Sequence, residues 1–191
     1  MSFPEPQSTE VDGIQVWFTD VPGPCMGGIT FRTGWIDEGL TNSGIDHMVE
    51  HLALHPFEPL RYDLNGSVTE LTTRFLANGT QDDVEAVITG VCGHLGALPL
   101  ERIAQERQIL DNESRRRGGS FAGLASTRFG TRGPGMIDFP EYTGGLTEDT
   151  VTAWVAERFT AGQAVVWMTR PPSPKLRLPL PPGDRLPTPE V

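Results

Sequence analysis

The sequence has few of the features that mark secreted or membrane proteins. It contains two cysteines in 191 residues, and neither belongs to a C-x-x-C pair typical of a zinc ribbon or redox motif. No stretch approaches eighteen consecutive apolar residues, and the first residues have neither the basic nor the apolar segment of a signal peptide. We therefore expect free thiols at Cys25 and Cys92, no membrane association and a cytoplasmic location.

Basic residues are also scarce in this chain. The chain has 15 Lys and Arg and 25 Asp and Glu, which gives a formal net charge of −10. Binding nucleic acid through its phosphates requires clustered Lys and Arg, so no nucleic-acid partner is expected, whereas an acidic surface favours basic peptides. The length and the hydrophobic content of 37% are those of one globular domain with a sizeable core.

Proline is unevenly distributed and divides the chain. Eight of the 17 prolines lie in the stretch PPSPKLRLPLPPGDRLPTPEV at the C-terminal end. Because proline has no backbone N–H to donate, this stretch is expected to be extended. The sequence therefore predicts one folded domain over residues 1–170 and a proline-rich linker or tail over residues 171–191.

Short β-rich runs alternate with helical patterns before that tail. Strands are predicted where β-branched and aromatic residues are bounded by turn formers, at 13–18, 28–32, 67–76 and 164–168. Apolar residues at helical spacing predict helices at 44–55, 82–98, 100–117 and 147–159, the first of them capped by Asn42-Ser43. This order is typical of an α+β fold, in which helices pack on a mainly antiparallel sheet.

The stretch that carries chemistry is an H-x-x-E-H motif on the first predicted helix, formed by His47, Glu50 and His51. Residues four apart share a helix face, so the two histidines can bind one metal ion. Glu50 lies beside that pair, where a base for a metal-activated water belongs. The motif therefore indicates metal-dependent hydrolysis, and the alternative is a pair of ordinary core or surface histidines.

Two histidines do not complete a catalytic zinc site, which needs a third protein ligand. Glu106 and Glu113 are seven residues apart and share one face of the third predicted helix, which makes them the best candidates. From spacing alone, a solvated helix face is the alternative. His55, one turn after His51, is a rival ligand at the end of the first predicted helix. Three further candidates rank lower: Glu58, Glu70 and His94.

The residues around the motif resemble the pitrilysin/insulinase family of zinc metallopeptidases, which includes the mitochondrial processing peptidase and carries the inverted H-x-x-E-H motif. The run FRTGWIDE and the following Gly44 are similar to the strand, turn and glycine before the family's zinc helix. The stretch Asn65-Gly66-Ser67-Val68-Thr69 is similar to the Asn-Ala-x-Thr stretch at the start of the strand that lines the family's substrate cleft. The resemblance covers about residues 10–170, which is one half of the family's two-half unit.

This resemblance implies a role for each candidate residue. His47, His51 and Glu113 would bind one Zn²⁺ per chain, Glu50 would be the general base, and Glu106 would support the site. The implied substrate is a peptide or unfolded segment, paired along a strand edge. The residues implied to contact it are Asn65, Ser67, Val68 and Thr69.

The chain departs from the family pattern in two respects. The interval of 62 positions from His51 to Glu113 is shorter than in the family, and the missing residues fall around 55–64. In addition, the family closes its cleft with a homologous second half, for which this sequence has no counterpart. We therefore expect a partner subunit or a C-terminal half, as in a heterodimer.

The sequence thus predicts a zinc-dependent metalloendopeptidase domain or catalytic subunit that needs a second half for full activity. One alternative is a non-catalytic peptide-binding or assembly module of the same fold, although such a module would be free to lose Glu50. The other alternative is an α+β interaction domain that binds no metal.

Overall fold

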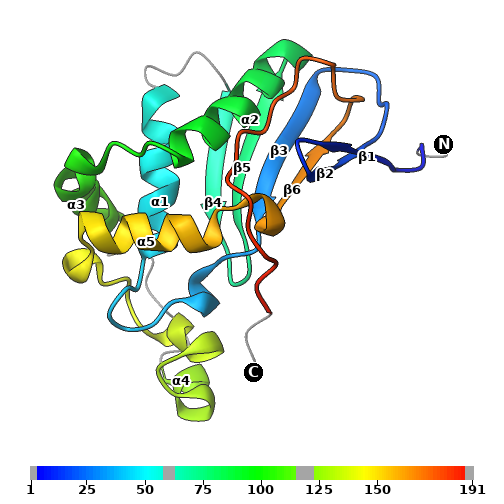
Figure 1. Ribbon diagram of the computed structural model, residues 1–191. Helices are drawn as coiled ribbons and strands as arrows, with labels where there is room; N and C mark the ends of the chain where they lie inside the picture. The colour runs from blue at the N-terminus through cyan, green and yellow to red at the C-terminus, as the bar shows by residue number, and fades with distance from the viewer. Residues whose placement is uncertain (1–3, 58–62, 115–122, 188–191) are drawn as a thin grey trace.

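A six-stranded sheet forms the centre of the molecule (Figure 1). The computed structural model describes residues 4–57, 63–114 and 123–187. The strand order is β1-β2-β6-β3-β5-β4, and every neighbouring pair is antiparallel except β2 and β6. The mainly antiparallel α+β fold is therefore confirmed. The strands are β1 (Gln7–Val11), β2 (Ile14–Phe18), β3 (Cys25–Phe31), β4 (Asp63–Val68), β5 (Thr73–Gly79) and β6 (Ala164–Met168).

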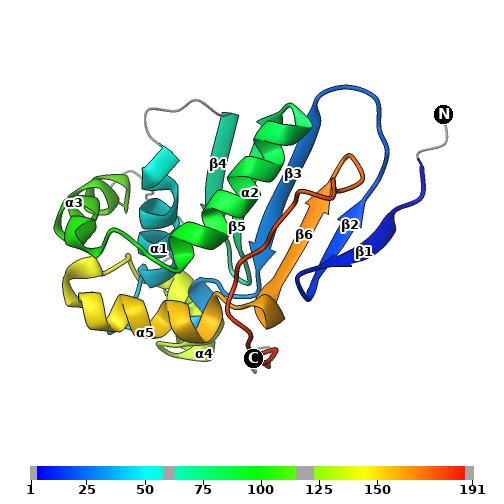
Figure 2. The same cartoon turned by 45° about the horizontal axis from the view of Figure 1, so that its top comes forward.

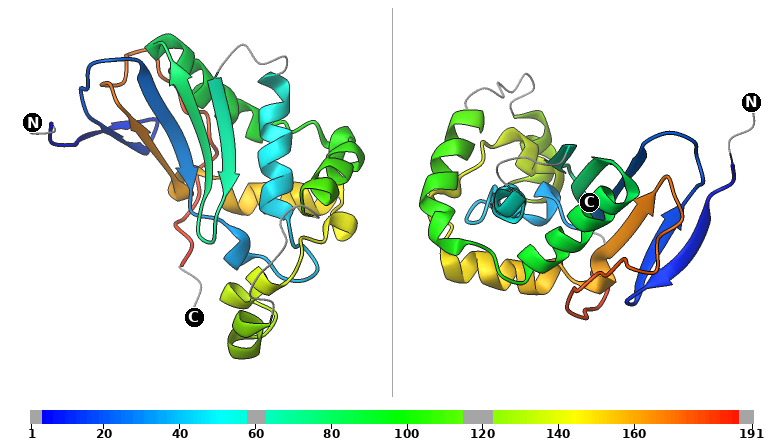
Figure 3. Two further views of the ribbon diagram at one scale, coloured as in Figure 1. Left: turned by 180° about the vertical axis from the view of Figure 1, so that it is seen from behind. Right: turned by 90° about the horizontal axis from the view of Figure 1, so that it is seen from above.

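The helices gather on one side of this sheet. Helix α2 crosses the face formed by β3 and β5, and α1 stands beside the edge strand β4 (Figure 2). From behind, the strands face the viewer without a helix in front of them (Figure 3). Among the described residues, no helix is both long and apolar enough to span a bilayer. The helices are α1 (Ile45–Leu54), α2 (Gln81–Leu95), α3 (Ile103–Ser114), α4 (Leu124–Phe129) and α5 (Glu148–Arg158).

The core fills the space between the sheet and these helices. In β2, Ile14 and Val16 are buried while the intervening side chains are exposed, as expected for a strand with one covered face. In α2, the buried residues recur at helical spacing and pack on the sheet. Cys25 and Cys92 lie in this core as free thiols, and burial raises the pKa of Cys92 to about 12.

The strand predicted over residues 67–76 is wrong, because the structure places a tight turn in its middle. β4 ends at Val68 and β5 begins at Thr73, and the Thr69 N–H donates to the carbonyl of Thr72 at 2.9 Å. β1 and most of β4 were not predicted, since they lack a continuous β-branched pattern. The other predicted strands and helices are present with shifted ends, and residues 115–117 of the third predicted helix lie outside the described residues.

The proline-rich segment packs against the folded domain. We define residues 171–187 as the C-terminal strap; it contains no helix or strand and runs along α2 (Figure 2). Leu176 and Leu178 are both 1% exposed and belong to the core. The Thr89 hydroxyl donates to the carbonyl of Arg177 at 2.8 Å, so backbone groups of the strap are satisfied by the domain. Its role as a linker to a further segment stays a prediction.

Glu85 is the main polar tie between α2 and the strap. Its buried carboxylate accepts hydrogen bonds from the Ser173 backbone N–H at 2.8 Å and from the Ser173 hydroxyl. We expect Glu85→Ala to lower the free energy of unfolding by about 1.5–3 kcal/mol, because it removes charged acceptors from buried donors. Urea unfolding measures this loss, with exposed Asp82→Ala in the same helix as the control. An equal loss of unfolding free energy in both variants would contradict the role of Glu85 in joining the strap to α2.

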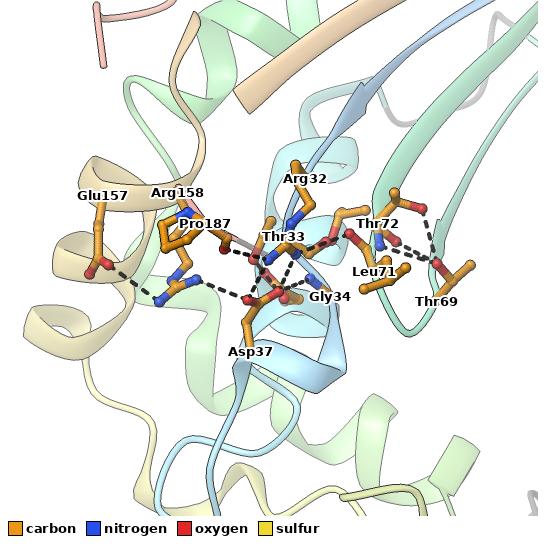
Figure 4. Close-up of polar contacts among 12 residues, drawn as sticks. Arg32, Thr33, Gly34, Asp37, Thr69, Leu71, Thr72, Glu157, Arg158 and Pro187 are labelled. Atoms are coloured by element: carbon orange, nitrogen blue, oxygen red, sulfur yellow. Dashed lines mark hydrogen bonds and ion pairs between the residues drawn. The ribbon is translucent and has the colours of Figure 1, made fainter. Parts of the chain in front are cut away.

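A second network joins the end of β3 to both the β4–β5 turn and the strap (Figure 4). The guanidinium of Arg32 pairs with the Asp37 carboxylate at 2.6 and 2.9 Å, and also donates to the carbonyls of Leu71 and Pro187. Arg158 of α5 approaches the same carboxylate at 3.4 Å. Asp37 therefore pairs with two arginines that are far apart in the sequence.

Candidate metal centre

Helix α1 carries the H-x-x-E-H motif and is buried along most of its length. His47 is 6% exposed and Glu50 is 7% exposed, so the motif is not a solvated surface feature. The helix begins after Gly44, whose φ of 81° suits glycine. The predicted cap at Asn42-Ser43 is wrong. The Glu38 carboxylate instead accepts from the backbone N–H groups of Gly44 and Asp46, at 2.7 and 3.1 Å.

Two buried carboxyls support the start of this helix. Burial and, next, the charge of Asp46 raise the pKa of Glu38 to about 8. Burial raises the pKa of Asp46 to about 7, although hydrogen bonds from the Trp154 indole at 2.8 Å and from the Thr33 hydroxyl favour its charged form. Asp46 therefore connects the motif helix to α5 and to the end of β3, which fixes the position of α1.

The two imidazoles of the motif face the same space through their Nε2 atoms. Glu50 Oε2 lies 3.7 Å from His47 Nε2 and 3.8 Å from His51 Nε2. The ring centroids of the two histidines are 4.9 Å apart. Among the described residues, His47, Glu50 and His51 form the group whose ligand atoms all lie within 4.8 Å of one another. The helical spacing thus brings the predicted metal-binding groups together.

Each imidazole meets a second carboxylate through its other ring nitrogen. Glu106 Oε2 lies 3.2 Å from His51 Nδ1, and Glu141 Oε2 lies 3.0 Å from His47 Nδ1. A carboxylate at Nδ1 favours the tautomer with its proton on that atom, which leaves the Nε2 lone pair for a metal. Glu106 is itself held by the guanidinium of Arg102 at 2.8 Å. Both imidazoles are therefore held by a carboxylate at Nδ1, with Nε2 on the side of Glu50.

Glu113 lies near the Nε2 atom of His47, as Glu50 does. Its Oε2 is 3.6 Å from His47 Nε2, and its side chain is 38% exposed. Zn²⁺ binds imidazole nitrogen and carboxylate oxygen at about 2.0–2.2 Å, so two atoms 3.6 Å apart can share one ion. The nitrogen and oxygen donors present here therefore fit zinc, and Glu113 lies beside His47 without belonging to the compact group of His47, Glu50 and His51.

The edge strand β4 runs beside the general-base candidate. A Cβ atom added at Gly66 would lie 1.9 Å from Glu50 Oε1, so the missing side chain lets the strand approach the carboxyl closely. Asn65, Ser67 and Val68 lie on this strand, while Thr69 lies in the turn that follows. In the part of the chain that the structure describes, β4 pairs only with β5, and its second edge is the one next to α1.

Three of the rival ligands, His55, Glu70 and His94, are not part of the compact group formed by His47, Glu50 and His51. His55 is in a short 3-10 turn after α1 and lines a neighbouring pocket. His94 Nδ1 lies 3.0 Å from the carbonyl of Ala53, and its ring packs on Phe57, so it joins α2 to α1. Glu70 is exposed in the β4–β5 turn. Glu58 lies outside the described residues, as does half of the stretch 55–64 where the missing residues were placed.

A pocket of about 490 Å³ opens next to the site, between α1, α3 and β4. Its polar wall includes Glu50, His51 and Glu106, so it is continuous with the candidate metal centre. Its apolar wall is formed by Leu54, Leu64 and Ile109.

Sequence reasoning missed Glu141 and Arg102. Glu141 lies in a loop 94 residues after His47, where no helical spacing or motif relates the two residues. Arg102 precedes Glu106 by four residues, and this i, i+4 spacing on a helix was the signal that could have found it.

No protein-family model and no curated protein sequence matches this chain, whereas solved structures of peptidases do resemble it. A protease from Helicobacter pylori has a TM-score of 0.69 and 20% identity, over 87% of this chain and 46% of the protease. Pitrilysin has a TM-score of 0.69 and 14% identity, over 98% of this chain and 24% of pitrilysin.

An inactive peptidase domain from Pseudomonas fluorescens is also similar, with a TM-score of 0.70 and 15% identity, over 97% of this chain and 53% of that one. This chain therefore spans about a quarter to about half of the length of the structures it resembles. It has the α+β fold of a pitrilysin-type peptidase half-domain, and it carries a buried His-x-x-Glu-His group within that fold.

Proposed function

We propose that this chain is the zinc-binding half of a peptidase that hydrolyses peptides or unfolded segments. The observation that carries the proposal is the pairing of each motif imidazole with its own carboxylate at Nδ1, which leaves both Nε2 atoms beside Glu50. A pair of ordinary core histidines would not need a carboxylate at each Nδ1 and a third carboxylate between them. The peptidase-like fold supports the same function.

His47, His51 and Glu113 would hold the ion, and Glu50 would act as the general base. Bound zinc supplies Lewis acidity, which polarises the scissile carbonyl and lowers the pKa of water. Glu50 takes a proton from the attacking water at its carboxylate and passes it to the nitrogen of the leaving amine. Its low exposure keeps competing bulk water away from that carboxylate.

The edge strand and the adjacent pocket support an extended peptide as substrate. A peptide laid along the outer edge of β4 would pair with the strand by backbone hydrogen bonds, as in strand addition, and would pass by Glu50. The pocket lined by Leu54, Leu64 and Ile109 would accept an apolar side chain next to the cleaved bond. The net charge of −10 favours peptides that carry basic residues away from the cleaved bond.

A second half completes the proposed enzyme. The similar structures extend well beyond the part that this chain matches, which supports a homologous partner subunit or a C-terminal continuation. The buried free thiols support a cytoplasmic location. A non-catalytic binding or assembly module is the second candidate, favoured by the likeness to an inactive peptidase domain.

Metal stoichiometry tests the proposal before any activity assay does. We expect about one zinc per purified chain by elemental mass spectrometry. Glu113→Ala is expected to lose most of that zinc, because it removes the third ligand, whereas exposed Glu101→Ala is expected to keep it. Zinc absent from wild type would contradict the proposed function and favour the binding module. Zinc retained in Glu113→Ala would contradict the ligand assignment.

A further inference from the structure

We propose that Glu141 is a positioning residue that fixes the His47 imidazole for metal binding. The inference rests on the proposed zinc site and adds to it a residue from a distant loop. Glu141 Oε2 lies 3.0 Å from His47 Nδ1, a distance typical of a hydrogen bond from a ring N–H to a carboxylate. The Glu141 side chain is 26% exposed and that of His47 is 7% exposed, so solvent competes weakly for this contact.

The packing around Gly44 brings Glu141 to this position. A Cβ atom added at Gly44 would lie 3.1 Å from Glu141 Cβ and 3.3 Å from Thr143 Cγ2. The loop therefore lies directly on the start of α1, where a side chain at position 44 would crowd it. This contact fixes the loop one helical turn before His47.

The loop is also braced from α3. The Thr143 hydroxyl donates to Asp111 Oδ1 at 3.1 Å, and Thr143 is 1% exposed. The guanidinium of Arg107 donates to the carbonyls of Thr143 and Leu146, at 3.1 and 2.8 Å. Because α1 and α3 hold both sides of the loop, the carboxylate of Glu141 is placed before any metal binds.

Glu141 does for His47 what Glu106 does for His51. Each carboxylate accepts from Nδ1–H and so favours the tautomer whose Nε2 lone pair is free. Without Glu141, the neutral His47 ring would populate the tautomer with its proton on Nε2, which cannot bind a metal at that atom. The ring would also lose the contact that fixes its orientation.

The tautomer can be measured directly in the metal-free protein. Long-range ¹H–¹⁵N NMR, recorded where both imidazoles are neutral, distinguishes Nδ1–H from Nε2–H. We expect His47 to be mainly the Nδ1–H form in wild type and to shift toward Nε2–H in Glu141→Ala. Glu141→Gln, which keeps an acceptor oxygen, is expected to retain more of the Nδ1–H form than Glu141→Ala does. The His51 signals provide the internal control, because Glu106 is unchanged.

Zinc affinity gives the second readout. We expect Glu141→Gln to weaken zinc binding by about 10–100-fold in a chelator competition, the range for carboxylates that support a metal-binding histidine. Exposed Glu148→Gln removes the same charge nearby and is expected to bind zinc as wild type does. An unchanged His47 tautomer in Glu141→Ala, or equal affinities in Glu141→Gln and Glu148→Gln, would overturn the role of Glu141. Wild-type protein that binds no zinc would instead contradict the proposed function. The tautomer measurement would still show whether Glu141 sets the proton position of His47.

Discussion

Replacing Glu50 with glutamine is expected to lower peptide hydrolysis by about 10²–10⁴-fold, the range for loss of a general base. Glu50 Oε2 lies 3.7 and 3.8 Å from the two Nε2 atoms, and an amide of the same size cannot take up a proton there. The zinc content is expected to stay at the wild-type level, because His47, His51 and Glu113 are unchanged. Cleavage of unfolded basic peptides is followed by mass spectrometry, with zinc measured on the same samples.

Two controls make this result specific. Glu113→Ala is expected to lose zinc and hydrolysis together, whereas exposed Glu148→Gln is expected to lose neither. Wild-type turnover in the Glu50→Gln variant would contradict the assignment of the base. If zinc is bound but wild type cleaves nothing, even when supplied with its partner half, the non-catalytic module becomes the better description.

Replacing Asp37 with alanine is expected to lower the free energy of unfolding by about 3–5 kcal/mol, the cost of breaking a buried ion pair by removing one partner. The Asp37 side chain is 4% exposed, and those of Arg32 and Arg158 are each 17% exposed. Removing the carboxylate therefore leaves two guanidinium groups in a largely desolvated site. The free energy of unfolding is measured by urea denaturation.

An exposed ion pair of the same kind is the matched control. Asp20 pairs with Arg170 at 3.1 Å, but its side chain is 68% exposed. Asp20→Ala is expected to cost less than about 1 kcal/mol, because water screens the pair and solvates the arginine that remains. Similar losses in the two variants would show that the Asp37 network contributes no more than a surface contact.

The sequence by itself was sufficient for the local features of this protein. Apolar spacing predicted the helix over 82–98, and the observed α2 covers residues 81–95. The H-x-x-E-H pattern brought His47, Glu50 and His51 together, because residues three and four apart lie on one helix face whatever the rest of the chain does. The alternation of strands and helices indicated the α+β fold in the same way.

Local sequence patterns failed to locate the turn between β4 and β5, because the residues of the turn resemble those of the strands on either side. The Thr-rich run from Ser67 to Phe75 contains no Gly, Pro, Asn or Asp, so no common turn former marks the turn between β4 and β5. That turn is set by contacts with a distant segment, since the N–H of Trp35 donates to the carbonyl of Thr69 at 3.2 Å. β-Propensity describes how well a residue suits a strand, and it does not say which distant segment that residue will contact.

Tertiary structure alone decided that Glu38 and Glu141 serve the candidate site, whereas Glu106 was already predicted from the sequence. Glu38 caps α1 from six residues before Gly44, and Glu141 reaches His47 from 94 residues away. The chain has 25 Asp and Glu, and a carboxylate acquires a role only from the groups that packing places within hydrogen-bonding distance. The sequence therefore determined the candidate metal site through helical geometry, whereas the contacts of Glu38 and Glu141 depend on how the loops and helices pack around α1.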